Sequence, residues 1–103
     1  MVLESKYVQV IQLLLTELMP GVEVWAFGSR VTGSPKPYSD LDLVLVSDLP
    51  LDLSKRAALS LAFEEADLPF RVDVLELRQL PPSLRAEVER AHEVLQPQPA
   101  QTR

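Results

Sequence analysis

Acidic side chains interrupt two apolar segments of this chain, at positions where a charge is unexpected. Asp40 and Asp42 open the apolar run 41–46, and Asp73 lies in the middle of the run 70–77. If both runs are neighbouring strands, the three carboxylates converge. Two carboxylates at positions i and i+2 of a strand share a face about 6.7 Å apart. They repel by roughly 2–3 kcal/mol at an effective dielectric near 20, so a cation, a proton or water must offset the charge.

The available ligand atoms indicate which cation this would be. The chain has no Cys and one His, so the carboxylate oxygens favour a hard ion such as Mg²⁺ or Mn²⁺. Mg²⁺ usually binds one or two carboxylates and completes its shell with water and phosphate oxygens, which points to a nucleoside triphosphate as the ligand. The alternative is structural: Asp40 could cap a turn after Ser39, and Asp42 could lie at a solvated strand end.

Gly28 and Ser29 follow the apolar segment 22–27 and precede a short segment that ends near Gly33. Backbone N–H groups at such a place can hold phosphate, and a glycine lets the backbone approach the ligand closely. An ordinary turn with Ser29 as N-cap is the competing interpretation. Ser29 is followed by ten residues and then Asp-Leu-Asp. This combination arises by chance in roughly one chain in a thousand, so it favours a phosphate and metal site.

The elements that must position these residues follow from apolar periodicity and from Pro and Gly. The sequence predicts helices over 3–19, over about 52–66 with Asp52 or Ser54 as its cap, and from Pro81-Pro82 through Leu95; strands over 22–27, 41–46 and 70–77; and a loop over 34–39. Helices packed on a small, largely buried sheet give an α/β (α+β) class. We expect one domain over 1–95 and a disordered tail over 96–103.

Several side chains are assigned to packing rather than to chemistry. Trp25 and Phe27 are predicted core residues, and His92 is expected near the end of the last helix with no catalytic role. The apolar face of the middle helix is predicted to include Leu53, Ala57, Leu61 and Ala62. Arg71 shares the strand face of Asp73 and could pair with it.

Composition excludes several classes of protein. The 103 residues, of 11.5 kDa, carry a net charge of −5 and no basic run, so direct nucleic-acid binding is not expected. No apolar stretch is long enough to span a membrane. Glu4, Gln9 and Gln12 do not suit a signal peptide, so we expect a cytoplasmic protein. One small domain leaves little room for a second lobe, so a partner should complete the site.

Three segments together resemble the nucleotidyltransferase superfamily of DNA polymerase β type, and most closely its smallest members, the minimal nucleotidyltransferases. The segments are Gly28-Ser29-Arg30-Val31-Thr32-Gly33, Ser39-Asp40-Leu41-Asp42-Leu43 and Arg71-Val72-Asp73-Val74. The resemblance implies a small mixed sheet with flanking helices. It also implies that Gly28 and Ser29 hold the triphosphate, that Asp40 and Asp42 ligate two Mg²⁺ ions, and that Asp73 is the third carboxylate.

In that family, such domains are often antitoxins paired with a helical HEPN-domain toxin, and some transfer AMP from ATP to a tyrosine of the toxin. The resemblance therefore implies an adenylyltransferase-like antitoxin that binds ATP and forms a homo- or hetero-oligomer. One position departs from the family pattern, because Thr32 stands where many members carry Arg. Arg30 or Lys36 could supply this charge at the phosphates. If neither does, the domain could neutralise a partner by contact alone. A third interpretation is a metal-dependent hydrolase that uses the same carboxylates.

Overall fold

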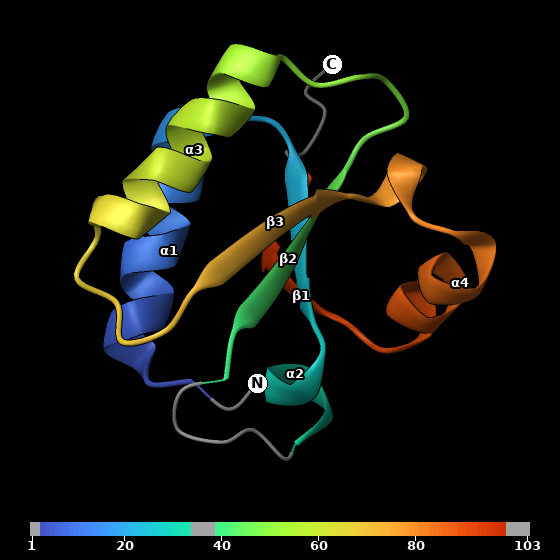
Figure 1. The fold of residues 1–103 in the computed structure, drawn as a ribbon, viewed down its shortest axis with the longest axis horizontal. Coiled ribbons are helices and arrows are strands. Elements are labelled where there is room, and N and C mark those ends of the chain that lie inside the picture. The colour runs from blue at the N-terminus through green and yellow to red at the C-terminus, as the bar shows by residue number, and fades with distance from the viewer. Residues whose placement is uncertain (1–2, 34–38, 99–103) are drawn as a thin grey trace.

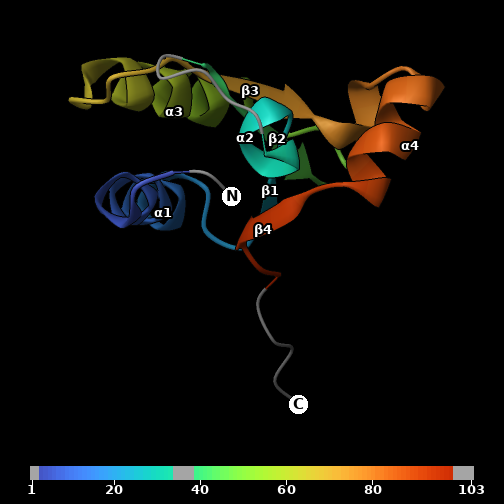
Figure 2. The ribbon, with the colours of Figure 1, turned by 90° about the horizontal axis from the view of Figure 1, so that it is seen from below.

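A four-stranded sheet forms the middle of three layers (Figures 1 and 2). The computed structural model describes residues 3–33 and 39–98. Its elements are α1 (Ser5–Leu18), β1 (Glu23–Phe27), α2 (Ser29–Thr32), β2 (Leu41–Val46), α3 (Leu53–Glu65), β3 (Val72–Glu76), the 3₁₀ turn η1 (Leu77–Gln79), α4 (Pro82–Arg90) and β4 (Glu93–Gln96). The strand order is β3-β2-β1-β4. β1 is antiparallel to β2 and β4, whereas β2 and β3 are parallel, which confirms the predicted mixed sheet.

Helices α1 and α3 cover one face of the sheet, on the left in Figure 2. Apolar residues recur along α1 at helical spacing, so Ile11 and Leu15 point together into this layer and are fully buried. β2 is the most buried strand because it lies between two neighbours and is apolar on both faces. The buried core on this side comprises Ile11, Leu15, Met19, Val24, Ala26, Leu41, Leu43, Leu45, Leu59, Phe63 and Leu95.

Helix α4 and η1 lie on the opposite face of the sheet (Figure 2). Val44, Leu77 and Val88 are buried there, and Trp25 and Phe27 pack against them, as predicted for core residues. This second layer is incomplete, because Leu75 of β3 keeps 37% of its surface exposed. The face that carries α4 therefore has open surface beside β3.

The structure corrects the predicted core face of α3. Asp52 caps the helix by accepting hydrogen bonds from the backbone N–H groups of Ser54 and Lys55. Leu59 and Phe63 are buried, whereas the predicted core residues Leu53 and Leu61 are 77% and 52% exposed. The prediction was wrong because α3 carries apolar residues on most of its circumference, so periodicity did not define one face.

The last predicted helix is also shorter than expected. α4 ends at Arg90, and residues 93–96 form β4, which pairs with the open edge of β1. Leu95, predicted on the helix, is buried in the core from this strand. His92 lies beyond the helix, stacks on Trp25 with 3.7 Å between ring centroids, and places Nδ1 2.8 Å from the Val88 carbonyl oxygen.

The predicted boundary after residue 95 falls inside β4, which continues to Gln96. Residues 99–103 of the predicted tail, and residues 34–38 of the predicted loop, lie outside the described residues. Within the described ranges, no helix combines the length and the apolarity that crossing a membrane requires.

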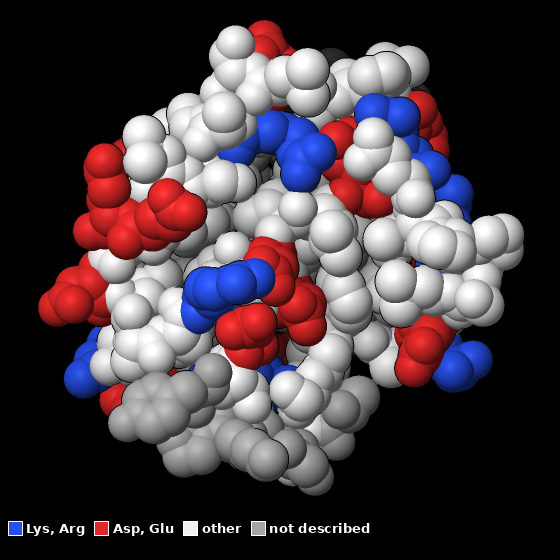
Figure 3. All heavy atoms as spheres, viewed as in Figure 1, with Lys and Arg blue, Asp and Glu red and all other residues white. Residues whose placement is uncertain are grey.

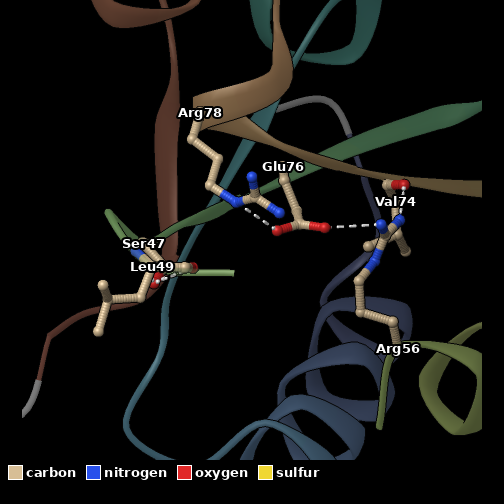
Figure 4. A network of polar contacts seen from close by, with 6 residues as sticks. All are labelled: Ser47, Leu49, Arg56, Val74, Glu76 and Arg78. Atoms are coloured by element: carbon tan, nitrogen blue, oxygen red, sulfur yellow. Dashed lines mark hydrogen bonds and ion pairs between the residues drawn. The ribbon is translucent and has the colours of Figure 1, made fainter. Parts of the chain in front are cut away.

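A buried ion network joins α3 to the end of β3 (Figure 4). Glu76 is 3% exposed and accepts hydrogen bonds from Arg56 Nη1 at 2.8 Å and Arg78 Nε at 3.1 Å. Arg56 Nη2 also donates to the Val74 carbonyl oxygen at 3.0 Å. Arg56 therefore holds the backbone of β3 directly after Asp73, which fixes the strand that carries this carboxylate.

Candidate active site

The parallel pairing of β2 and β3 brings two of the predicted carboxylates together. Asp42 and Asp73 are register partners, and paired residues of adjacent strands project from the same face of the sheet. On its other side, Asp42 is paired with Phe27, the last residue of β1. Asp40 precedes β2 and is exposed at the same end of the sheet. The strand register therefore brings two of the three predicted carboxylates side by side, and the third, Asp40, lies at the same end of the sheet.

The three carboxylates influence one another electrostatically. Burial raises the pKa of Asp42 above its ordinary value, and the nearby negative charges of Asp73 and Asp40 raise it further. A cation at this place would relieve that repulsion. Figure 3 shows acidic side chains gathered around a basic one, near the beginnings of β2 and β3.

Arg71 contacts the acidic cluster directly. Arg71 Nη2 donates to Asp73 Oδ1 at 3.0 Å, which confirms the pairing considered from the sequence. The hydrogen bond with Asp73, together with the charges of Asp73 and Asp40, raises the pKa of the Arg71 guanidinium. The Arg71 side chain is 76% exposed, so the pair is accessible to solvent and to ligands.

Gly28 lies directly against the Asp42 carboxylate. Its φ of 89° and ψ of −160° fall in a region that essentially only glycine adopts. A Cβ atom built at this position would lie 2.6 Å from Asp42 Oδ2, which is closer than real Cβ atoms approach other atoms. Ser29 follows as the first residue of α2 and is exposed. The absence of a side chain at Gly28 therefore makes room for Asp42 at the predicted phosphate cradle.

Of the two cations predicted to contact the phosphates, Arg30 is the one that the structure describes. Arg30 is only 6% exposed, its Nε donates to the Ser39 carbonyl oxygen at 2.9 Å, and its guanidinium lies 4.6 Å from the Phe70 ring centroid. Arg30 is therefore buried rather than solvated, and its contact with phosphate stays a prediction. Lys36 lies outside the described residues.

The carboxylates fit a hard cation that shares its shell with a ligand. Their oxygens are the donors that Mg²⁺ and Mn²⁺ prefer, and their mutual repulsion would be offset by positive charge. Among the described residues, no three His, Cys, Asp or Glu side chains already converge closely enough to form a complete metal site. This arrangement suits an ion that binds one or two carboxylates and takes its remaining ligands from phosphate and water.

Two hollows flank the cluster, and neither could be predicted from local residue spacing. One lies between α3 and β3 and includes Asp40, Arg71 and Asp73 in its wall. The other lies between the end of β1 and α4 and includes Gly28 and Ser29. Their walls combine residues that are distant in the sequence, which only the packing of α3 and α4 brings together.

Comparison with known proteins agrees with this geometry. The model of the polymerase beta nucleotidyltransferase family matches residues 10–99, so the chain belongs to that family and is a nucleotidyltransferase. It is 42% identical, over 94 residues, to the probable protein adenylyltransferase MntA of Haemophilus influenzae. That alignment covers 91% of this chain and 82% of the relative.

Solved structures give the same fold. A toxin–antitoxin crystal structure with AMP-PNP matches with a TM-score of 0.70 and 27% identity, over 86% of this chain and 72% of that chain. The MNT antitoxin in complex with tri-AMPylated Shewanella oneidensis HEPN toxin matches with a TM-score of 0.58 and 23% identity, over 86% and 71% of the two chains. The predicted resemblance to minimal nucleotidyltransferases is confirmed.

Proposed function

We propose that this chain is an antitoxin that transfers AMP from ATP to a tyrosine hydroxyl of a HEPN-domain toxin, with Mg²⁺ as the cofactor. The observation that carries the proposal is the position of Asp42, between the Cα of Gly28 and its register partner Asp73. A phosphate cradle and an acidic cluster thus meet at one end of the sheet. The similarity to MntA and to a toxin–antitoxin structure with AMP-PNP supports an adenine nucleotide as the substrate and a toxin as the partner. A cytoplasmic location is the corresponding expectation.

Each residue has a distinct task in this proposal. Gly28 and Ser29 bind the β- and γ-phosphates through backbone N–H groups and the Ser29 hydroxyl. Asp40, Asp42 and Asp73 would hold two Mg²⁺ ions, or Mn²⁺ in their place. Bound there, the ions would neutralise the triphosphate charge and lower the pKa of the attacking hydroxyl. The chain itself contributes positioning and fixed charge, so it needs no nucleophile of its own.

The test is transfer of label from [α-³²P]ATP to the protein encoded by the adjacent gene, which we expect to be a HEPN-domain toxin. We expect the Asp40→Asn, Asp42→Asn double variant to lose at least about 100-fold in rate. Asp48→Asn is the control, because Asp48 is exposed and lies beyond the far end of β2. Label transfer that persists unchanged in the double variant would exclude this mechanism.

A binding module that neutralises its partner by contact is the second candidate. The observation that favours it is Arg30, which turns inward to Ser39 and Phe70, while Thr32 stands where many relatives carry Arg. Thermal melting distinguishes the two functions. ATP and Mg²⁺ at 100 times the dissociation constant should stabilise an enzyme by about 2.7 kcal/mol. No shift, with or without the HEPN protein, would favour the binding module.

A further inference from the structure

Arg71 and Asp73 project from the same face of the sheet as Asp42. Val44 packs in the layer of α4, so Asp42, two residues earlier on β2, faces the same layer. Asp73 is the register partner of Asp42 and shares its face. Arg71 lies two residues before Asp73, and its Nη2 donates to Asp73 Oδ1 at 3.0 Å. The two carboxylates and the guanidinium therefore meet on the face of the sheet that α4 partly covers.

The ion pair between Arg71 and Asp73 engages an oxygen that the proposed metal site needs. The side chains of Arg71 and Asp73 are 76% and 38% exposed, so the guanidinium can turn away from the carboxylate without disturbing the core. Arg30, at the same end of the sheet, is instead buried, lies over the Phe70 ring and donates to the Ser39 carbonyl oxygen. Of these two arginines, Arg71 is the one that can change partners.

The Arg71 guanidinium and a divalent cation compete for Asp73. Both are positively charged and both take an oxygen of the same carboxylate, so they repel each other at contact distance. Occupation of the carboxylates by a metal ion therefore favours release of Arg71. The released side chain stays close to the cluster, because its Cα lies only about 6.7 Å from the Cα of Asp73 along an extended strand.

The strand order determines which phosphate of the nucleotide the released Arg71 meets. Gly28 follows β1, Asp42 belongs to β2 and Arg71 precedes β3, so Gly28 and Arg71 lie on opposite sides of Asp42 (Figure 1). In the proposed function, Gly28 and Ser29 hold the β- and γ-phosphates. The phosphate on the side of Arg71 is then the α-phosphate, which is the group transferred.

We infer that Arg71 is a catalytic residue that exchanges partners: it pairs with Asp73 in the free chain and binds the α-phosphate once metal and nucleotide occupy the site. This inference rests on the proposed function and adds a residue to its site. A guanidinium offers a phosphate two parallel N–H donors and a permanent charge. That charge stabilises the non-bridging oxygens of the α-phosphate during transfer. Arg71 thus opposes binding of the metal alone and promotes reaction in the loaded site.

Removal of the guanidinium should move two measurements in opposite directions. Mn²⁺ affinity without nucleotide is measured from the electron paramagnetic resonance signal of free Mn²⁺, and kcat is measured as label transfer to the protein encoded by the adjacent gene. For Arg71→Ala we expect Mn²⁺ to bind about two- to fivefold more tightly, because an exposed ion pair no longer competes. We expect kcat to fall at least about tenfold in the same variant. Arg71→Lys keeps the charge but not the planar fork, so its Mn²⁺ affinity should match the unmodified chain while its kcat stays low.

The matched control is Arg85→Ala, which removes an exposed arginine from its ion pair with Glu89 and should leave both measurements within about twofold. Calorimetry with Mn²⁺ and a non-hydrolysable ATP analogue gives a readout that needs no partner, and Arg71→Ala should bind this complex more weakly than the unmodified chain. Unchanged or weaker binding of Mn²⁺ alone in Arg71→Ala would overturn the competition for Asp73. Unchanged kcat and analogue affinity would overturn the contact with phosphate. Absence of label transfer by the unmodified chain would contradict the proposed function, and the two titrations then decide the role of Arg71 separately.

Discussion

Replacing Gly28 by alanine should disturb both the backbone and the acidic cluster. A non-glycine residue at the φ of 89° and ψ of −160° found there costs about 1–3 kcal/mol. The new Cβ would also lie 2.6 Å from Asp42 Oδ2, so the carboxylate must move away. Since Asp42 is held in the middle of the sheet between β1 and β3, we expect this movement to cost about 1 kcal/mol more.

The matched control is Gly21→Ala. Gly21 has a φ of 81°, but a Cβ there would meet no atom within 4 Å, so only the backbone cost applies. We expect Gly28→Ala to lower the free energy of unfolding by about 2–4 kcal/mol and Gly21→Ala by about 1–2 kcal/mol. For a domain of this size, each kcal/mol corresponds to roughly 4–8 °C in Tm.

A double-mutant cycle separates the cost of backbone strain at position 28 from the cost of the contact between the new Cβ and the Asp42 carboxylate. In an Asp42→Ala background the carboxylate is gone, so Gly28→Ala should cost only its backbone strain, and the coupling energy should be about 1 kcal/mol. Denaturant unfolding gives these values, and calorimetry should show at least a tenfold loss of Mn²⁺–ATP affinity in Gly28→Ala. The reasoning is refuted if Gly28→Ala costs the same in both backgrounds and leaves nucleotide affinity intact.

Further predictions concern charge. The pKa of Asp42 is raised in the folded state, so its contribution to stability falls as pH rises above about 4. Without metal, Asp42→Asn should therefore be more stable than the unmodified chain at pH 7, by about 1 kcal/mol after allowance for screening, and the gain should vanish near pH 3. Melting from pH 3 to 7 measures this, and a gain that grows toward low pH would contradict it. Arg56→Ala removes one of the two partners of buried Glu76 and should cost about 2–4 kcal/mol in denaturant unfolding. Arg85→Ala breaks the exposed pair with Glu89 and should lower the free energy of unfolding by less than about 0.5 kcal/mol. If Arg56→Ala and Arg85→Ala lowered it equally, the burial of Glu76 would not explain the expected difference.

The sequence by itself determined the chemistry of the candidate site. Asp42 and Asp73 stand out because each interrupts an apolar strand, where an ionised group needs a compensating charge. Gly28 and Ser29 stand out through their position between a strand and a short helix. The strand β2 was predictable because its apolar run is short and bounded by turn residues.

Tertiary structure alone decided how those residues meet. Local periodicity indicates that a side chain is buried but not which partner covers it, so the buried face of α3 and the strand β4 were not recognised. The register that pairs Asp42 with Asp73 depends on a parallel crossover through α3, and the contact of Gly28 with Asp42 depends on the pairing of β1 with β2. The hollow beside β3 exists only because α3 packs next to an edge strand. Each of these is a contact between segments distant in the chain, which is set by the packing of the whole domain and leaves no trace in local residue spacing.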